Sequence, residues 1–169
     1  MLKNIILLAG LTCSTAFSAN LFAENITPLP LKQRAEVIDD LLQKRVQQLL
    51  PELMQQNDID MWVLISREYN EDPVLRTFLT SDWLSARRRT ILVIHNPGNG
   101  EKLETLAIAR YDVGKVFKSA WNPELQPDQW QRLTEIITER NPDTIAINQS
   151  KDFAQADGVT ATDKALFMA

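Results

Sequence analysis

Met61-Trp62-Val63-Leu64-Ile65 and, farther along, Thr90-Ile91-Leu92-Val93-Ile94 are the stretches that decide the fold. Each is a continuous apolar run, as expected of a strand covered on both faces. The second run leads into a turn, residues 96–100 (Asn-Pro-Gly-Asn-Gly), and apolar residues return at 103–109, so we predict a β-hairpin here. Because helical segments separate the hairpin from the other strands, the sheet is expected to be mixed.

Helical patterns flank these strands. An apolar stripe at steps of three and four comprises Leu31, Ala35, Ile38, Leu42, Val46, Leu49 and Leu53. Pro51 either kinks this helix or opens a second one. Later we expect a short helix at 73–79, an extended piece at 113–117, a helix at 127–140 that buries Trp130, Leu133, Ile136 and Ile137, and a last strand at 144–147. The prediction is an α/β domain with a mixed sheet flanked by helices.

The first 23 residues have the layout of a secretory signal. Lys3 is their only charge, residues 5–11 are almost all apolar, and residues 14–19 supply small side chains for cleavage after Ser18 or, as a poorer alternative, Ala23. A membrane anchor would need about 20 mostly apolar residues, and three hydroxyl residues interrupt this stretch too early. We therefore expect export to the periplasm or beyond the cell, without membrane attachment after cleavage.

Composition excludes several kinds of chemistry. The only cysteine, Cys13, lies within the predicted signal, so the mature chain would have no disulfide, thiol nucleophile or thiolate metal site. His95 is the only histidine, and neither a Gly-x-Ser-x-Gly elbow nor a His-x-x-x-His pair is present. A net charge of -4 gives no electrostatic reason to bind nucleic acid. We predict no catalytic residue and no metal ligand in this chain.

Two groups of carboxylates could in principle bind a hard cation: Asp58 with Asp60, and Glu68 with Glu71 and Asp72. The first pair has the position of a cap before a strand. Residues 87–89 are three consecutive arginines, which would alternate between the two faces of a strand. The pattern therefore favours solvation or ion pairing over a single anion-binding patch.

The most informative polar stretch follows the first strand. Its candidate site residues, which we expect to face a cleft, are Arg67, Glu68, Tyr69, Asn70 and Asp72. Open α/β sheets bind ligands at the carboxyl ends of their strands. The alternative is a simple capped connection, in which Asp72 caps the helix that Pro73 opens.

The tail of the sequence predicts one more helix. Thr160-x-x-Asp163 is a capping-box-like start, so a helix should begin at Ala161. The nine residues from there to Ala169 are fewer than the roughly 12–15 that an isolated helix needs. Either a short helix docks on the sheet, or the helix leads into a second domain.

Several blocks of this sequence, in this order, resemble the N-terminal domain of exported Xaa-Pro aminopeptidase-like proteins, relatives of prolidase and creatinase. The blocks are Ile59-Asp60-Met61-Trp62, Arg67-Glu68-Tyr69-Asn70-Glu71-Asp72-Pro73, Ser85-Ala86-Arg87-Arg88-Arg89-Thr90, residues 147–154 and residues 157–161. The resemblance extends from about Arg34 to the end.

Together with the signal predicted at 1–23, the resemblance implies a creatinase/prolidase-type domain of ribonuclease H-like topology at 24–160, and at 161–169 the start of a helix leading to a catalytic domain. In that family the N-terminal domain does no chemistry, forms dimers and borders the catalytic cleft. The pita-bread catalytic domain holds two divalent metals, which activate a water for attack on a peptide substrate. None of those ligands can be assigned to this chain, so we expect no cofactor in it.

Two further functions stay open. The chain could be a free-standing exported interaction domain that binds or regulates a full-length relative. It could also be a hydrolase that uses the carboxylates of the 67–72 loop, in which case Glu68→Gln would abolish its activity.

Overall fold

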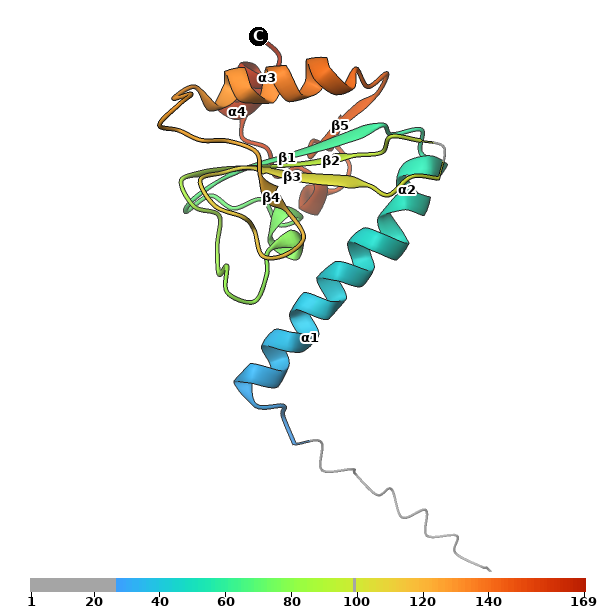
Figure 1. The fold of residues 1–169 in the computed structure, drawn as a ribbon, viewed down its shortest axis with the longest axis vertical. Coiled ribbons are helices and arrows are strands. Elements are labelled where there is room, and N and C mark those ends of the chain that lie inside the picture. The colour runs from blue at the N-terminus through green and yellow to red at the C-terminus, as the bar shows by residue number, and fades with distance from the viewer. Residues whose placement is uncertain (1–26, 99) are drawn as a thin grey trace, which may run out of the picture.

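The computed structural model describes residues 27–98 and 100–169, which form a mixed five-stranded sheet with helices on both faces (Figure 1). The predicted α/β class and mixed sheet are confirmed. The predicted secretory signal lies outside the described residues, and so does Asn99 of the predicted turn.

The sheet has the strand order β4-β3-β2-β1-β5. Among the three central strands, β2 (Arg89–His95) is antiparallel to both β1 (Met61–Arg67) and β3 (Glu104–Ile108), and the β2–β3 pair confirms the hairpin. The short strands β5 (Ile145–Ile147) and β4 (Lys118–Ser119) add parallel edges next to β1 and β3. The register pairs Arg67 with Arg89, so the carboxyl end of β1 lies beside the start of β2.

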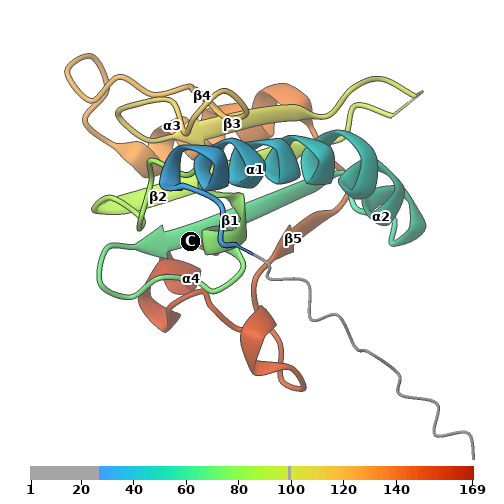
Figure 2. The same ribbon diagram turned by 90° about the horizontal axis from the view of Figure 1, so that it is seen from below.

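Both faces of the central strands are covered, which is why their sequences are continuously apolar. One core cluster lies under the N-terminal helical segment and includes Leu64, Leu92 and Ile94. The other lies under α3 (Gln129–Arg140) and includes Val63, Ile91 and Val93. Figure 2 shows the N-terminal helix crossing the first face, while α3 and α4 (Ala161–Phe167) lie on the far side.

The N-terminal segment contains α1 (Leu31–Lys44), a π-helical turn η1 (Arg45–Leu49) and α2 (Leu50–Gln56), which Pro51 opens. The predicted single stripe is wrong. Leu42 and Val46 are buried, and the buried row continues to Leu50 and Met54, whereas the predicted members Leu31, Ile38, Leu49 and Leu53 are exposed. The π-turn inserts about one extra residue per turn, so the side chains that follow it shift their phase by one position.

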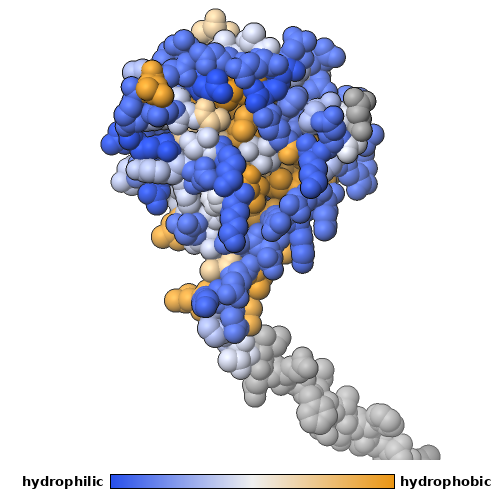
Figure 3. Space-filling model, viewed as in Figure 1, coloured by the Kyte–Doolittle hydropathy of each residue, from blue (hydrophilic) through white to orange (hydrophobic). Residues whose placement is uncertain are grey.

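The first half of α1 extends away from the sheet (Figure 1). Its apolar side chains Val37, Ile38 and Leu41 are 45–53% exposed. Figure 3 shows hydrophobic side chains along this part of the helix, next to hydrophilic ones. Because this half of α1 diverges from the sheet, these apolar side chains stay partly uncovered.

The prediction of an extended piece at 113–117 is wrong. Val113 and Phe117 instead close a tight turn through two backbone hydrogen bonds of 2.9 and 3.2 Å. Gly114 has a φ of +58° there, a conformation that glycine adopts without the steric cost of a side chain. Lys118 and Ser119 then form β4.

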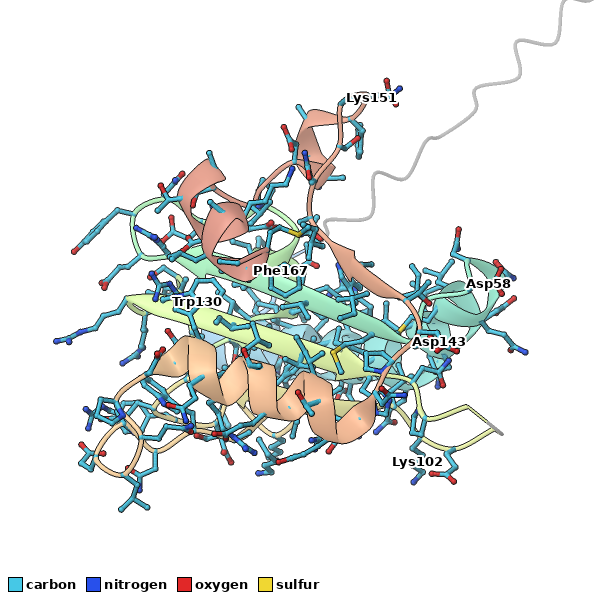
Figure 4. All side chains as sticks on the ribbon, turned by 90° about the horizontal axis from the view of Figure 1, so that it is seen from above. Asp58, Lys102, Trp130, Asp143, Lys151 and Phe167 are labelled. Carbon is cyan, nitrogen blue, oxygen red and sulfur yellow. The ribbon has the colours of Figure 1, made fainter. Side chains whose placement is uncertain are left out.

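Of the later helices, α3 and α4 follow the sequence closely, whereas the one predicted at 73–79 does not. Asp128 caps α3, and Leu133 and Ile136 are buried while Trp130 and Ile137 pack partly buried beside them, as predicted. The helix expected at 73–79 is a short 3₁₀ turn, η2 (Leu75–Phe78). A second 3₁₀ turn, η3 (Ala154–Ala156), precedes α4. Figure 4 labels Trp130 of α3 and Phe167 of α4 on the same face of the sheet.

Within residues 27–98 and 100–169, no helix combines the length and the apolar character that crossing a bilayer requires.

Candidate functional site

Arg67 does not end in solvent but in an ion pair with the tail. Its Nε and Nη2 donate to the two oxygens of Asp163 at 2.8 and 2.7 Å, a bidentate geometry. Arg89, the register partner of Arg67, donates from Nε to the same carboxylate at 3.2 Å. Partners in register point to the same face of a sheet. Two guanidinium groups therefore meet one carboxylate of α4.

Asp163 is fully buried. Burial raises the pKa of its carboxyl, but hydrogen bonds from Arg67 and Thr160 and the charges of Arg67 and Arg89 outweigh burial and hold that pKa below its ordinary value. The Asp163 N–H donates to Thr160 Oγ1 at 3.1 Å, and the Thr160 hydroxyl donates to Asp163 Oδ2 at 2.9 Å. This reciprocal pair is the predicted cap of α4.

Asp72 makes a second connection to the tail. Its buried carboxylate accepts from the backbone N–H groups of Val74 and Leu75 at 2.6 and 2.9 Å, so it holds the chain where η2 begins, two residues later than the predicted opening at Pro73. Asn148 Nδ2 donates to both carboxylate oxygens at 2.9 and 2.8 Å. Trp62 Nε1 donates to Asn148 Oδ1 at 2.9 Å, which fixes the orientation of that amide.

Gly158 completes this contact because it lies directly against Asp72. A Cβ atom on residue 158 would lie 2.2 Å from Asp72 Oδ2 and 3.0 Å from its Cα. Only glycine allows the tail this close to the loop. We call Arg67, Arg89, Asp163, Asp72, Asn148 and Gly158 together the tail clamp.

The remaining predicted site residues lie farther out. Glu68 borders an open groove, and its carboxylate accepts from the Arg88 N–H at 3.1 Å. Tyr69 is 92% exposed and has a φ of +68°, and Asn70 is exposed beside it. The five residues therefore do not converge on one point: Arg67 and Asp72 hold the tail, Glu68 borders the groove, and Tyr69 and Asn70 face solvent. Their role at the cleft of a parent enzyme stays a prediction.

The groove that Glu68 borders is open and has a volume of about 1030 Å³. It lies where β1 ends, β2 begins and β3 ends. Five arginines line it, together with the aromatic residues Trp83, Tyr111 and Trp121. Gln129 at the start of α3 also lines it, and its buried amide donates to the Arg89 carbonyl at 3.0 Å and to the Ile108 carbonyl. We call it the arginine groove.

The expectation that residues 87–89 cannot share one surface is wrong, because all three line this groove. Arg88 has a φ of +51°, so the chain is not extended there and the alternation of faces breaks. Arg87 lies over the Trp83 ring, with its Cζ atom 5.1 Å from the ring centroid. Arg89 lies over Trp130 at 4.9 Å. Of these three arginines, Arg89 is the one that forms the predicted ion pair within the described residues.

In the other carboxylate pair, Asp60 has a structural role. Asp60 accepts from the Thr144 N–H at 2.9 Å and its hydroxyl at 3.0 Å, and these hydrogen bonds lower the pKa of Asp60. Asp60 thereby joins the start of β1 to the segment before β5. At the end of β2, Nδ1 of His95 lies 3.6 Å from Oε2 of Glu104. Among the described residues, no three His, Cys, Asp or Glu side chains come together as a metal site requires.

Comparison of the chain with protein-family models, with curated proteins and with solved structures finds no match. The family named from the sequence blocks therefore stays a prediction.

Sequence reasoning missed the two residues that organise the tail clamp. Asp163 was recognised only as part of a helix cap, and Asn148 only as part of a block. Both are more than 70 residues from their partners in the clamp. One signal was available: Arg67 ends one apolar strand and Arg89 starts the next, so antiparallel pairing would bring their charges together. A buried carboxylate between them is what such a pair requires.

Proposed function

We propose that this chain is a creatinase/prolidase-type N-terminal domain of an exported Xaa-Pro aminopeptidase-like protein. In this role it performs no chemistry, and it supports a catalytic domain and a second subunit. The finer proposal for the fold is a ribonuclease H-like topology. Three antiparallel strands in the order β3-β2-β1, followed by β5 parallel to β1, support it.

The observation that carries the proposal is that the separate sequence blocks of the resemblance contact one another. Trp62 and Asp72 both bond Asn148, Glu68 bonds the backbone of Arg88, and Gly158 lies against Asp72. Three of the blocks lie in the loop and strands, and two lie in the tail. Their shared task is to fasten the segment after β5 to the end of the sheet.

The carboxylates that a hydrolase would need are already engaged. Asp72 is buried under four hydrogen bonds, Glu68 accepts from the Arg88 N–H, and Glu71 accepts from the Tyr69 N–H at 3.2 Å. A general base needs free access to the proton it removes. These contacts favour a scaffold over a hydrolase that uses the 67–72 loop.

The exposed stripe of α1 supports the proposed docking role. Val37, Ile38 and Leu41 form one apolar surface on a helix that extends beyond the sheet. Contiguous exposed apolar side chains often mark protein interfaces. In the proposal, the two divalent metals and the peptide substrate belong to the catalytic domain of the parent.

The test combines activity with reconstitution. We expect the purified protein to hydrolyse neither dipeptides nor Xaa-Pro peptides with manganese, cobalt or zinc added. It should form a complex with the catalytic domain of an exported Xaa-Pro aminopeptidase expressed without its own N-terminal domain. Size-exclusion chromatography with light scattering measures this complex. Metal-dependent turnover, or a catalytic domain that forms no complex, contradicts the proposal.

The same stripe on α1 also favours the alternative of a free-standing domain that binds a full-length relative. Capture by an intact relative but not by its isolated catalytic domain would select this alternative. In either case, Ile38→Asp/Leu41→Asp should abolish the complex. The matched control, Gln33→Asp/Gln43→Asp, adds the same charge at exposed polar positions of α1 and should leave the complex intact.

A further inference from the structure

The arginine groove has unpaired positive charge. Five arginines line it, against two carboxylates, Glu68 and Asp82. Arg67 and Arg89 are occupied by Asp163, and Arg110 pairs with Glu124 at 2.6 Å. Within the part of the chain that the structure describes, the guanidinium groups of Arg87 and Arg88 form no ion pair, and both residues are exposed. The groove is thus locally cationic on a chain whose net charge is -4.

The two unpaired arginines are held by their surroundings. The Arg87 guanidinium lies over Trp83, which leaves its edge available for hydrogen bonds. Glu68 holds the Arg88 backbone with two hydrogen bonds. The Glu68 N–H donates to the Arg88 carbonyl at 2.6 Å, and the Glu68 carboxylate accepts from the Arg88 N–H. The loop between η2 and β2, which carries both arginines, is fixed to α1, because the Ser81 N–H and hydroxyl donate to the Asp39 carboxylate at 2.8 and 3.1 Å. Less freedom is therefore lost when an anion binds.

Apolar side chains border the same groove. Leu84 is 86% exposed and Tyr111 is 59% exposed, on the two loops that flank the arginines. A ligand that suits this surface needs carboxylates for the guanidinium groups and apolar groups for the rim. The groove spans the ends of three strands, a width of about 10 Å. An extended peptide covers that distance with about three residues.

We propose that the arginine groove binds an extended acidic peptide segment, whose carboxylates pair with Arg87 and Arg88 and whose apolar side chains contact Leu84 and Tyr111. The planar guanidinium fork matches a carboxylate with two parallel hydrogen bonds. A nucleic acid fits less well, because the net negative charge of the chain repels a long polyanion, whereas a peptide places only a few charges inside the groove. This site is separate from the scaffold role, and a groove that binds no peptide leaves that role standing.

The experiment measures fluorescence anisotropy of a labelled peptide of alternating Glu and Leu, titrated with the purified protein. We expect saturable binding that weakens with added salt, and at least tenfold weaker binding of a matched Gln-Leu peptide. Arg87→Gln/Arg88→Gln should weaken binding of the Glu-Leu peptide at least tenfold. Leu84→Ser, which keeps every charge, should weaken it several-fold.

The matched control is Arg76→Gln/Lys115→Gln, which removes the same two charges at exposed positions outside the groove. The affinity of this control variant for the Glu-Leu peptide should stay within twofold of that of the unsubstituted protein. Equal loss in the control and in the groove variant overturns the proposal, because binding would then follow net charge alone. Equal affinity for the Gln-Leu peptide, or tighter binding of a single-stranded oligonucleotide of the same charge, also overturns it.

Discussion

Arg89 and Arg88 are neighbours in sequence and have opposite environments. Arg89 points from β2 toward a buried carboxylate, and its guanidinium also lies over Trp130. Arg88 turns out of the strand with a positive φ and has no ion-pair partner among the described residues. The tail clamp, to which Arg89 belongs, and the exposed part of the arginine groove, to which Arg88 belongs, differ in the same way. In the tail clamp the side chains of Asp163, Asp72 and Asn148 are buried and hydrogen-bonded, whereas Arg87 and Arg88 are exposed in the arginine groove.

The difference shows how one run of like charges can serve two purposes. In the clamp, two guanidinium groups offset the burial of Asp163, so their charge stabilises the fold. In the groove, the charge is solvated and contributes little to folding. Substitutions in the clamp should therefore lower stability, and substitution of the exposed Arg88 in the groove should leave it nearly unchanged.

The largest effect is expected from Asp163→Asn. This change leaves Arg67 and Arg89 side by side without a counter-charge, and it should lower the free energy of unfolding by about 3 kcal/mol. Urea denaturation measures it. The matched control, Asp152→Asn, alters an exposed side chain that makes no ion pair within the described residues and should cost less than about 0.5 kcal/mol. Equal effects of the two variants would contradict the clamp.

Gly158→Ala should be the next most damaging change. The added Cβ would lie 2.2 Å from Asp72 Oδ2, and the buried carboxylate can move only by losing hydrogen bonds. We expect a loss of about 2 kcal/mol. Gly100→Ala separates steric overlap from backbone strain, since nothing lies within 4 Å of a Cβ there and only its φ of +75° opposes the change. It should cost about 1 kcal/mol. A tolerated Gly158→Ala would show that the tail packs less closely.

The two neighbouring arginines provide the sharpest comparison. Arg89→Gln removes one ion pair and one stacking contact and should cost about 1 kcal/mol in thermal unfolding. Arg88→Gln removes the same charge one residue away and should change stability by less than about 0.5 kcal/mol. Equal losses would mean that net charge, not position, sets the effect.

The smallest effect is a difference in pH dependence. The pKa of Asp163 is lowered in the folded protein, so its stabilisation is complete above its unfolded pKa of about 3.9 and is lost as the pH falls through the folded pKa. The gap in unfolding free energy between the original protein and Asp163→Asn should be constant from pH 7 to 5 and narrow in stronger acid. The other carboxylates contribute equally to the pH dependence of both proteins, so their contribution cancels in this difference. A gap that is independent of pH down to pH 2 would contradict an ionic role for Asp163.

Local patterns predicted most of the secondary structure because they depend on near neighbours. The apolar runs at β1 and β2 and the turn before β3 contain their own signals, and so do the caps at Asp72 and Thr160. The phase of the N-terminal helix was not predictable in this way. Its π-turn allows Leu50 and Met54 to reach the core in place of Leu49 and Leu53, a choice made by packing against the sheet.

The candidate site also has features that local sequence patterns predicted and features that only the tertiary structure decided. The sequence marked the loop from Arg67 to Asp72 as more than a connection, and by itself it determined the α/β class, the mixed sheet and the caps. Only the tertiary structure decided that Arg67 and Asp72 hold the tail, and that Arg87 and Arg88 share one groove. The physical reason is distance along the chain. Hydrogen-bond caps and apolar periods act over a few residues, whereas the partners in the clamp lie 74 to 96 residues apart and meet only when the sheet has formed.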